Sequence, residues 1–169
     1  SRMKTFAEMG GKLTSNPAEV GKDTDAVFVM VMHGSQVMEV VLNKDGLLST
    51  LKPGSAIILT ATIRANEVKN LSESLKDSGL HLIDSPVSGG FPGAQEGTLT
   101  MMASGENSVL DEFATVMQAV SKNIHRVGTE PGMGQTVKAC LQSLIGSIFS
   151  ATFEASALAA KAGVNGQVL

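Results

Sequence analysis

Lys138 is the residue whose type and position point most directly to chemistry. It lies about one turn into an apolar segment that begins after Pro131, Gly132 and Gly134 and is closed by Gly163. The positive end of a helix dipole disfavours a cation by roughly a few tenths of a kcal/mol, and burial disfavours the charged form as well. Both effects push a lysine towards its neutral form, which suits a group that takes up and returns a proton. The alternative is a lysine whose stem packs while its ammonium reaches water.

Further polar groups could contact a small acid. Gln142 lies four residues after Lys138, on the same face of the helix, so its amide can share whatever the lysine touches. The sequence Ser88-Gly89-Gly90 follows an apolar run. Glycines there let backbone N–H groups approach an anion closely, and the serine hydroxyl adds a donor. An ordinary glycine turn is the alternative interpretation of this loop.

These residues must be positioned by a scaffold in which apolar runs alternate with helical patterns. The first run is continuously apolar, which is typical of a parallel strand covered on both faces. Strands separated by helices at this spacing predict right-handed βαβ crossovers and an α/β fold with a parallel sheet. We expect strands at Ala26–Met32, Ser55–Thr62 and Leu80–Asp84, and helices at Ser35–Leu42 and Asn66–Asp77.

In sheets of this kind, ligands bind beyond the carboxyl ends of the strands. Three loops of this chain qualify, namely His33–Ser35, Thr60–Ile63 and Ser85–Gly90. The dinucleotide fingerprint G-x-G-x-x-G does not occur after a strand, because Gly132-Met133-Gly134 continues to Val137 and follows no apolar strand directly. The three histidines adjoin no acidic or cysteine cluster, so we expect no metal site.

The pattern changes after Asp84. Two further strands are expected around a helix, and apolar residues cover most of the circumference of a long helix near the C-terminus, which predicts a core helix buried on several sides. These elements are strands at Thr98–Ala103 and Ile124–Val127 and helices at Ser108–Ala119 and Gly134–Ala162. Shorter elements are expected as a helix at Arg2–Met9, a strand at Lys12–Thr14, a helical turn at Ser15–Glu19 and a new helix beginning at Asn165.

Composition narrows the class of protein. The chain has 169 residues, 43% of them hydrophobic, and a net charge of −3, which indicates a globular protein without the basic surface that nucleic acid requires. The uncharged run Ala139–Phe153 is shorter than the roughly 20 residues of a membrane span, and no signal peptide is visible, so no membrane partner is expected. The lone Cys140 excludes an internal disulfide and fits a reducing compartment, for which we predict the cytoplasm, with an organelle as the alternative.

Three motifs, in this order along the chain, resemble the β-hydroxyacid dehydrogenase family, which includes 3-hydroxyisobutyrate dehydrogenase and tartronate semialdehyde reductase. The motifs are Asp84-Ser85-Pro86-Val87-Ser88-Gly89-Gly90, then Gly93-Ala94 with Gly97-Thr98-Leu99-Thr100, and finally Gly132-x-Gly134-x-x-x-Lys138. Within that family, Glu130-Pro131-Gly132, Arg126 and Gln142 are most similar to the L-threonate dehydrogenase branch. The resemblance implies a Rossmann-type parallel sheet followed by a long interdomain helix.

The resemblance also implies an oxidoreductase that transfers a hydride between NAD or NADP and the hydroxyl-bearing carbon of a small hydroxy acid, such as a threonate-like sugar acid. Lys138 matches the catalytic lysine, the general acid–base of the reaction. Ser88-Gly89-Gly90 matches the loop that holds the substrate carboxylate, and we add Gln142 to the substrate-binding residues. Family members often carry two asparagines where this chain has Leu141 and Gln142, a departure that bears on the substrate more than on the reaction.

For the cofactor, the resemblance implies a site at the ends of the predicted strands. Thr62 matches a threonine near the cofactor, and we assign Met32 and His33 to the same site. The family's first two strands, with their Gly-rich phosphate turn, have no counterpart in this sequence, so we expect an incomplete domain. Residues 1–130 are expected to form a partial NAD(P)-binding Rossmann-type domain, and residues 131–169 the long interdomain helix and the start of a helical C-terminal domain.

Two other interpretations compete with this one. The first is a non-catalytic scaffold that kept the dehydrogenase fold for binding or interaction, and the second is an imine-reducing relative. Lys138 argues against both, because an abandoned site has no need of a cation at a helix start and imine-reducing relatives are expected to replace the lysine. We expect the full-length protein to form a homo-oligomer, and this segment alone to be inactive.

Overall fold

The computed structural model describes residues 2–169 of the chain. Strands and helices alternate as predicted up to the third strand. The elements are α1 (Arg2–Glu8), α2 (Pro17–Gly21), β1 (Ala26–Val29), α3 (Gly34–Leu42), the 3-10 helix η1 (Leu47–Ser49), β2 (Ala56–Leu59), α4 (Ala65–Leu75), β3 (His81–Asp84), β4 (Val87–Ser88), α5 (Gly90–Glu96), β5 (Leu99–Ser104), α6 (Asn107–Glu112), α7 (Ala114–Gln118), β6 (Ser121–Gly128) and α8 (Met133–Lys161).

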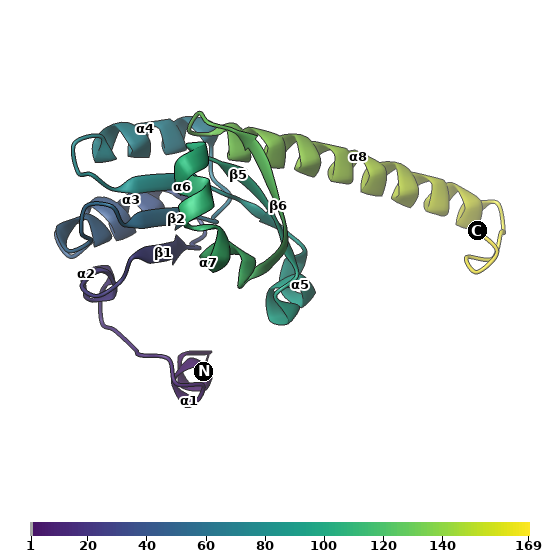
Figure 1. Cartoon of the computed structure of the whole chain (residues 1–169). Coiled ribbons are helices and arrows are strands. Elements are labelled where there is room, and N and C mark those ends of the chain that lie inside the picture. The colour runs from purple at the N-terminus through teal and green to yellow at the C-terminus, as the bar shows by residue number, and fades with distance from the viewer. Residues whose placement is uncertain (1) are drawn as a thin grey trace.

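One sheet organises these elements (Figure 1), with the strand order β1-β2-β3-β5-β4 and with β6 on β5. β1, β2 and β3 are parallel and in register, so the predicted parallel sheet is confirmed in this half. β5 meets β3 antiparallel, through Asp84 and Ser104, and is antiparallel to β4 but parallel to β6. The second half of the sheet is therefore mixed. β1 pairs with β2 alone among the described strands, which leaves its other edge open.

Two hydrophobic cores lie on opposite faces of the sheet, and β2 contributes to both. Ile57 and Leu59 face a core formed with α3, η1 and α4, whereas Ala56 and Ile58 face a core formed with α6 and α7. All four residues are buried, which explains why the β2 segment is continuously apolar. Because β1–β3 are parallel and in register, their carboxyl ends lie together at one end of the sheet.

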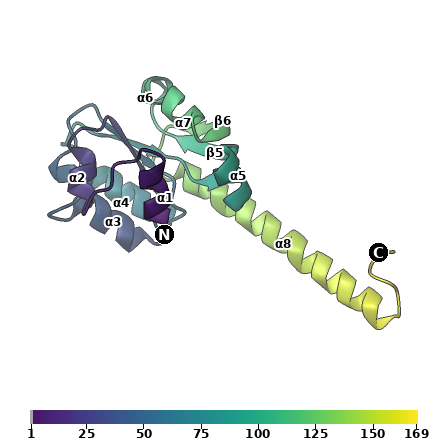
Figure 2. The ribbon, with the colours of Figure 1, turned by 90° about the horizontal axis from the view of Figure 1, so that it is seen from below.

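α8 starts and ends where the glycines predict. Gly132, at the N-cap, and Gly163, just past the end, have φ values of +90° and +81°, a region that glycine adopts at little cost. The helix leaves the sheet after its first turns and projects away from it (Figure 1; Figure 2 gives a view from below). Its large apolar side chains beyond the first turns are exposed, namely Leu144, Ile148, Phe149, Phe153 and Leu158. The prediction of a core helix buried on several sides is therefore wrong for most of α8 in this chain, because no described element packs against it there.

By length and composition, α8 is also long and apolar enough to cross a membrane, and no other helix within residues 2–169 is. The uncharged run Ala139–Phe153 underestimates this length, because the 29-residue helix continues through further apolar turns. A single helix of this kind is weak evidence for a membrane, since the core helices of soluble proteins meet the same criteria.

Several element boundaries differ from prediction. β1 ends at Val29 because its partner β2 ends at Leu59, and Met30 and Met32 lie beyond the ladder, 64% and 76% exposed. The segment 12–14 is not a strand, since no described strand lies beside it to accept its hydrogen bonds. The predicted helix 108–119 is interrupted at the buried Phe113, and the residues after Asn165 form a turn rather than a helix. The short elements β4 and α5 were not predicted.

Candidate functional site

The structure brings the predicted catalytic and substrate-binding residues to one cavity of about 630 Å³. Lys138 and Gln142 reach it from the start of α8, and the predicted acid-binding loop reaches it from the junction of β4 and α5. Apolar side chains of β1 and β5 form much of the remaining wall, together with Thr60 just after β2. The lining residues are Phe28, Met30, Thr60, Val87, Ser88, Gly89, Gly90, Ala94, Leu99, Met101, Val120, Lys138 and Gln142. The cavity is mostly apolar with a few convergent polar groups, as small-molecule sites usually are.

Lys138 is buried at the wall of this cavity, with only 7% of its surface exposed. Burial lowers the pKa of its ammonium group below the usual value, because the charged form loses hydration. No described residue forms a hydrogen bond or ion pair with its side chain. The nitrogen is therefore available to a ligand. Gln142, one turn further along, is exposed and lines the same cavity.

The start of α8 lacks a local acidic cap, and a carboxylate from elsewhere takes its place. Asp84, at the carboxyl end of β3, is 1% exposed and accepts a hydrogen bond from the backbone N–H of Gln135 at 3.2 Å. Burial raises the pKa of this carboxyl group, an effect opposed by hydrogen bonds from Gln135 and from the backbone of Gly132 and Gly134. A negative charge at this end of a helix also opposes the macrodipole that disfavours Lys138.

The predicted acid-binding loop is better described as a strand end followed by a short helix. Ser88 ends β4, Gly89 is the N-cap of α5 and Gly90 is its first residue. The φ values of the two glycines are +126° and +60°, so side chains there would be strained. The glycines therefore expose backbone to the cavity without side chains in between.

The three predicted cofactor residues share a second cavity of about 360 Å³. Met32 and His33 come from the loop after β1, and Thr62 from the loop after β2. All three are exposed, and the first residue of α3, Gly34, lies beside them. Both cavities lie beyond the ends of β1 and β2, where a Rossmann-type sheet binds a dinucleotide.

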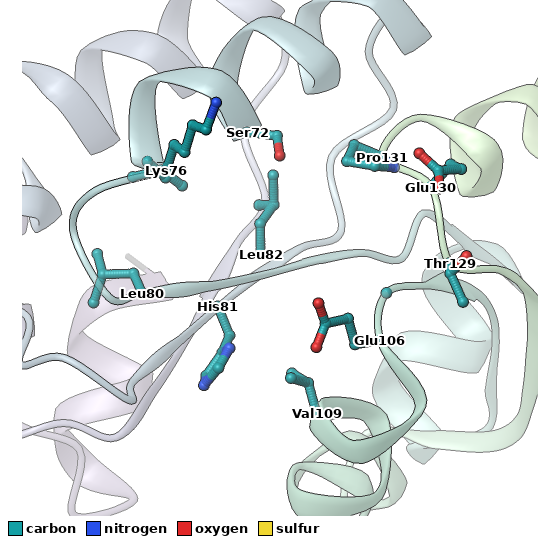
Figure 3. A pocket seen from close by; sticks show the side chains of 12 residues that line it. Ser72, Lys76, Leu80, His81, Leu82, Glu106, Val109, Thr129, Glu130 and Pro131 are labelled. Carbon is teal, nitrogen blue, oxygen red and sulfur yellow. The ribbon is translucent and has the colours of Figure 1, made fainter.

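Figure 3 shows another cavity, of about 430 Å³, at the N-terminal end of β3, whereas Asp84 lies at its carboxyl end. It lies between the end of α4, the start of β3 and the connections into α6 and α8, and it is lined in part by Lys76, His81, Glu106 and Glu130. None of the predicted site residues lines it. Within residues 2–169, no group of three or more His, Cys, Asp or Glu side chains could hold a metal ion.

Parallel strands that end at two adjoining cavities, one of them holding a buried lysine, define an α/β nucleotide-binding domain of the Rossmann type. Residues 1–128 match the family described as the NAD binding domain of 6-phosphogluconate dehydrogenase, and the chain belongs to that family.

Individual relatives narrow the group further. The chain is 38% identical to L-threonate dehydrogenase of Escherichia coli strain K12 over 161 residues, which cover 95% of this chain and 53% of the relative. It is 32% identical to the mitochondrial 3-hydroxyisobutyrate dehydrogenase of Mus musculus, covering 98% and 49%. The structure of Mycobacterium tuberculosis 3-hydroxyisobutyrate dehydrogenase with L-serine matches with a TM-score of 0.85 and 28% identity, covering 94% of this chain and 53% of that one. The predicted family resemblance is confirmed, and the chain spans about half the length of the curated relatives it matches.

Two buried residues that support the site are not among the predicted site residues. Asp84 belongs to one of the sequence motifs without a predicted function, and Gln135 lies between Gly134 and Lys138. Both have less than 3% of their surface exposed, which is unusual for such polar side chains. The available signal was an acidic residue ending an otherwise apolar strand, since a buried carboxylate requires partners.

Proposed function

We propose that this chain carries the catalytic lysine and part of the cofactor site of an NAD(P)-dependent hydroxyacid dehydrogenase. The observation that carries the proposal is the convergence of Lys138, Gln142 and the segment Ser88–Gly90 on one cavity, next to a second cavity at the dinucleotide-binding edge. Membership of an NAD-binding family and the dehydrogenase names of the relatives support it.

In the proposed reaction, NAD or NADP accepts or supplies the hydride when bound. Lys138 takes the proton from the substrate hydroxyl during oxidation and returns it during reduction. Its lowered pKa favours this use, because a larger fraction of the amine is neutral near physiological pH than in an exposed lysine. The lack of a described partner for its ammonium group leaves the proton free to move to and from substrate.

The acid is held, in this proposal, by donors that do not depend on the lysine. Ser88 offers a hydroxyl, and Gly89 and Gly90 offer backbone that a carboxylate can approach closely. Gln142 supplies an amide on the lysine side of the cavity, whereas Leu141 supplies none. We propose Thr62, Met32 and His33 as the residues that contact the cofactor.

The exchange of Lys138 for alanine tests the proposal in the full-length protein. We expect turnover to fall by at least about 10²–10⁴-fold, the usual contribution of a general acid–base, while cofactor affinity stays nearly constant. Lys161→Ala, on the exposed last turn of the same helix, is the matched control and should leave turnover unchanged. A Lys138→Ala protein that kept a tenth of wild-type turnover would show that this lysine is structural and would favour the non-catalytic scaffold.

For the substrate, we propose a polyhydroxylated acid such as L-threonate. Gln142 offers hydrogen bonds to a second hydroxyl of the substrate, whereas a branched apolar acid has no second hydroxyl to bind this amide. The ratio of kcat/KM for L-threonate to that for 3-hydroxyisobutyrate tests this choice. A clear preference for 3-hydroxyisobutyrate would overturn it without affecting the assignment of Lys138.

We also propose a boundary near residue 130, with the partial dinucleotide-binding domain before it and the interdomain helix after it. β6 ends at Gly128 and α8 begins at Met133, so the boundary falls in the connection between them. A cytoplasmic location and a homo-oligomeric full-length protein belong to the same proposal.

A further inference from the structure

Gln135 forms the densest polar network in the site region although it lines neither cavity. Its side-chain nitrogen Nε2 donates to the carbonyl oxygen of Ala61 at 3.0 Å and to Oδ1 of Asp84 at 2.9 Å. Its oxygen Oε1 accepts from the backbone N–H of Ile63 at 3.0 Å. Both side-chain N–H groups and the carbonyl oxygen are thus engaged, and the residue is only 2% exposed.

Asp84 fixes the orientation of this amide. If the amide of Gln135 were turned over, its oxygen would face two acceptors, the Asp84 carboxylate and the Ala61 carbonyl, and its NH₂ group would face the N–H of Ile63. Buried polar groups left unpaired cost about 1–3 kcal/mol each, so one orientation is strongly favoured. The backbone N–H of Gln135 donates to the same carboxylate, which fixes the first turn of α8 as well.

The hydrogen bonds of Gln135 connect segments that line the two cavities. Ala61 and Ile63 flank Thr62, so the loop that lines the cofactor cavity is bound on both sides of Thr62 to a single side chain. Lys138 follows Gln135 by three residues and lies near the same face of α8, where it lines the substrate cavity. Gln135 therefore links the helix that carries Lys138 to the loop that lines the cofactor cavity.

The start of α8 cannot shift to compensate. A Cβ atom on Gly134 would lie 2.5 Å from the carbonyl oxygen of Met102 and 2.7 Å from that of Asp84, so the helix already approaches the sheet backbone closely. The start of the helix is confined by backbone on the sheet side, and the link to the cofactor loop is made by Gln135.

We propose that Gln135, oriented by Asp84, is a positioning residue that sets the amine of Lys138 against the reacting end of the bound cofactor. The inference rests on the proposed function. Misplacement of a reacting group by about 1 Å can cost on the order of 10²-fold in rate, so the loss of this link should lower kcat rather than substrate affinity.

The test uses the full-length protein with three variants, Gln135→Leu, Asp84→Asn and the two combined, assayed with L-threonate, L-serine and 3-hydroxyisobutyrate. Gln118→Leu, on the exposed surface of α7, is the control.

We expect Gln135→Leu to lower kcat by about 10²-fold with a nearly unchanged KM for the acid. The apparent pKa in the pH–rate profile for oxidation should rise, because release of the loop around Thr62 admits water to Lys138. The kcat losses of the two single variants should be less than additive in the double variant, because both remove the hydrogen bond between Nε2 of Gln135 and Asp84, whereas the bond from the backbone N–H of Gln135 to Asp84 does not depend on the glutamine side chain.

Each contrary outcome has one meaning. Wild-type kcat and pH profile in Gln135→Leu would overturn the inference, as would a double variant whose losses simply add. A kcat that falls only in proportion to the folded fraction, with an unchanged pH profile, would show that the network is structural, and so would the failure of both single variants to fold. If Lys138→Ala is inactive while Gln135→Leu is normal, only the positioning inference fails. If Lys138→Ala is active, the proposed function fails first.

Discussion

The first turns of α8 and the remainder of the helix differ in a way that their sequences do not suggest. The buried residues of α8 are Gly134, Gln135 and Lys138, which are a glycine, an amide and a cation. The apolar residues further along, such as Phe153 and Leu158, are 69% and 71% exposed. The usual relation between side-chain polarity and burial is thus inverted along one helix.

The difference shows that the surroundings, and not the composition of the helix, decide what is buried. At its start, α8 lies against β3, β5 and the loop after β2, which supply hydrogen-bonding partners for the polar groups. Further along, no described element lies beside it, and apolar side chains remain in contact with solvent. This arrangement suits a helix that carries a site at its buried polar start and an interaction surface along its exposed apolar remainder.

Paired glycine substitutions give the largest expected contrast between the two regions. Gly134→Ala places a Cβ within 3 Å of two backbone oxygens, which cannot move aside as a flexible side chain could, so we expect a loss of about 3 kcal/mol in the free energy of unfolding. Gly146→Ala, on the exposed part of α8, meets no atom within 4 Å and should stabilise the helix by up to about 1 kcal/mol. Denaturant unfolding of both variants measures the contrast. Equal effects would show that the two regions do not differ in confinement.

The strand pattern of the first half could be predicted because it depends on local hydrophobicity. The apolar runs that form β2 and β3 contribute to cores on both faces of the sheet, and Thr62 and Ser88 follow these runs, so their position beyond the carboxyl ends of the strands could be predicted. A strand is predicted at Thr98–Ala103, where β5 lies, but its antiparallel pairing with β3 and β4 is not. The strand β4 is not predicted either, because two residues, Val87 and Ser88, carry too little pattern to indicate a strand.

The site was predicted in part for a related reason. Residues that line cavities, such as Lys138 and Gln142, belong to sequence motifs that a family resemblance can identify. Asp84 and Gln135 form a hydrogen bond although they are 51 residues apart in the sequence. Nothing in the sequence around either residue indicates its partner. Contacts between residues so distant in sequence depend on the assembled sheet, and a single sequence does not contain them explicitly.

A pH titration of stability examines the buried charge at the start of α8. The pKa of Lys138 in the folded protein lies below its ordinary value of 10.5, so the unfolded chain binds more protons between those two values. The free energy of unfolding should therefore rise with pH across that window, as the cost of burying a cation disappears. Lys138→Met removes this dependence and should stabilise the protein below the window. Lys161→Met, at the exposed end, should leave the pH dependence unchanged, and a Lys138→Met protein with wild-type pH dependence would contradict the assignment of a buried charge.

The smallest effect on stability is expected from polar substitutions on the exposed part of α8. Ile148 and Phe153 are 53% and 69% exposed, so their replacement by glutamine should change the free energy of unfolding by no more than about 0.5 kcal/mol. Their effect on association should be larger, because exposed apolar side chains spaced along one helix favour contact between copies. We expect light scattering to show that the 169-residue chain associates in solution and that Ile148→Gln combined with Phe153→Gln reduces this association. A monomeric parent chain would show that the exposed apolar surface is not sufficient for self-association, and a large loss of stability in the double variant would show that these side chains are packed in solution.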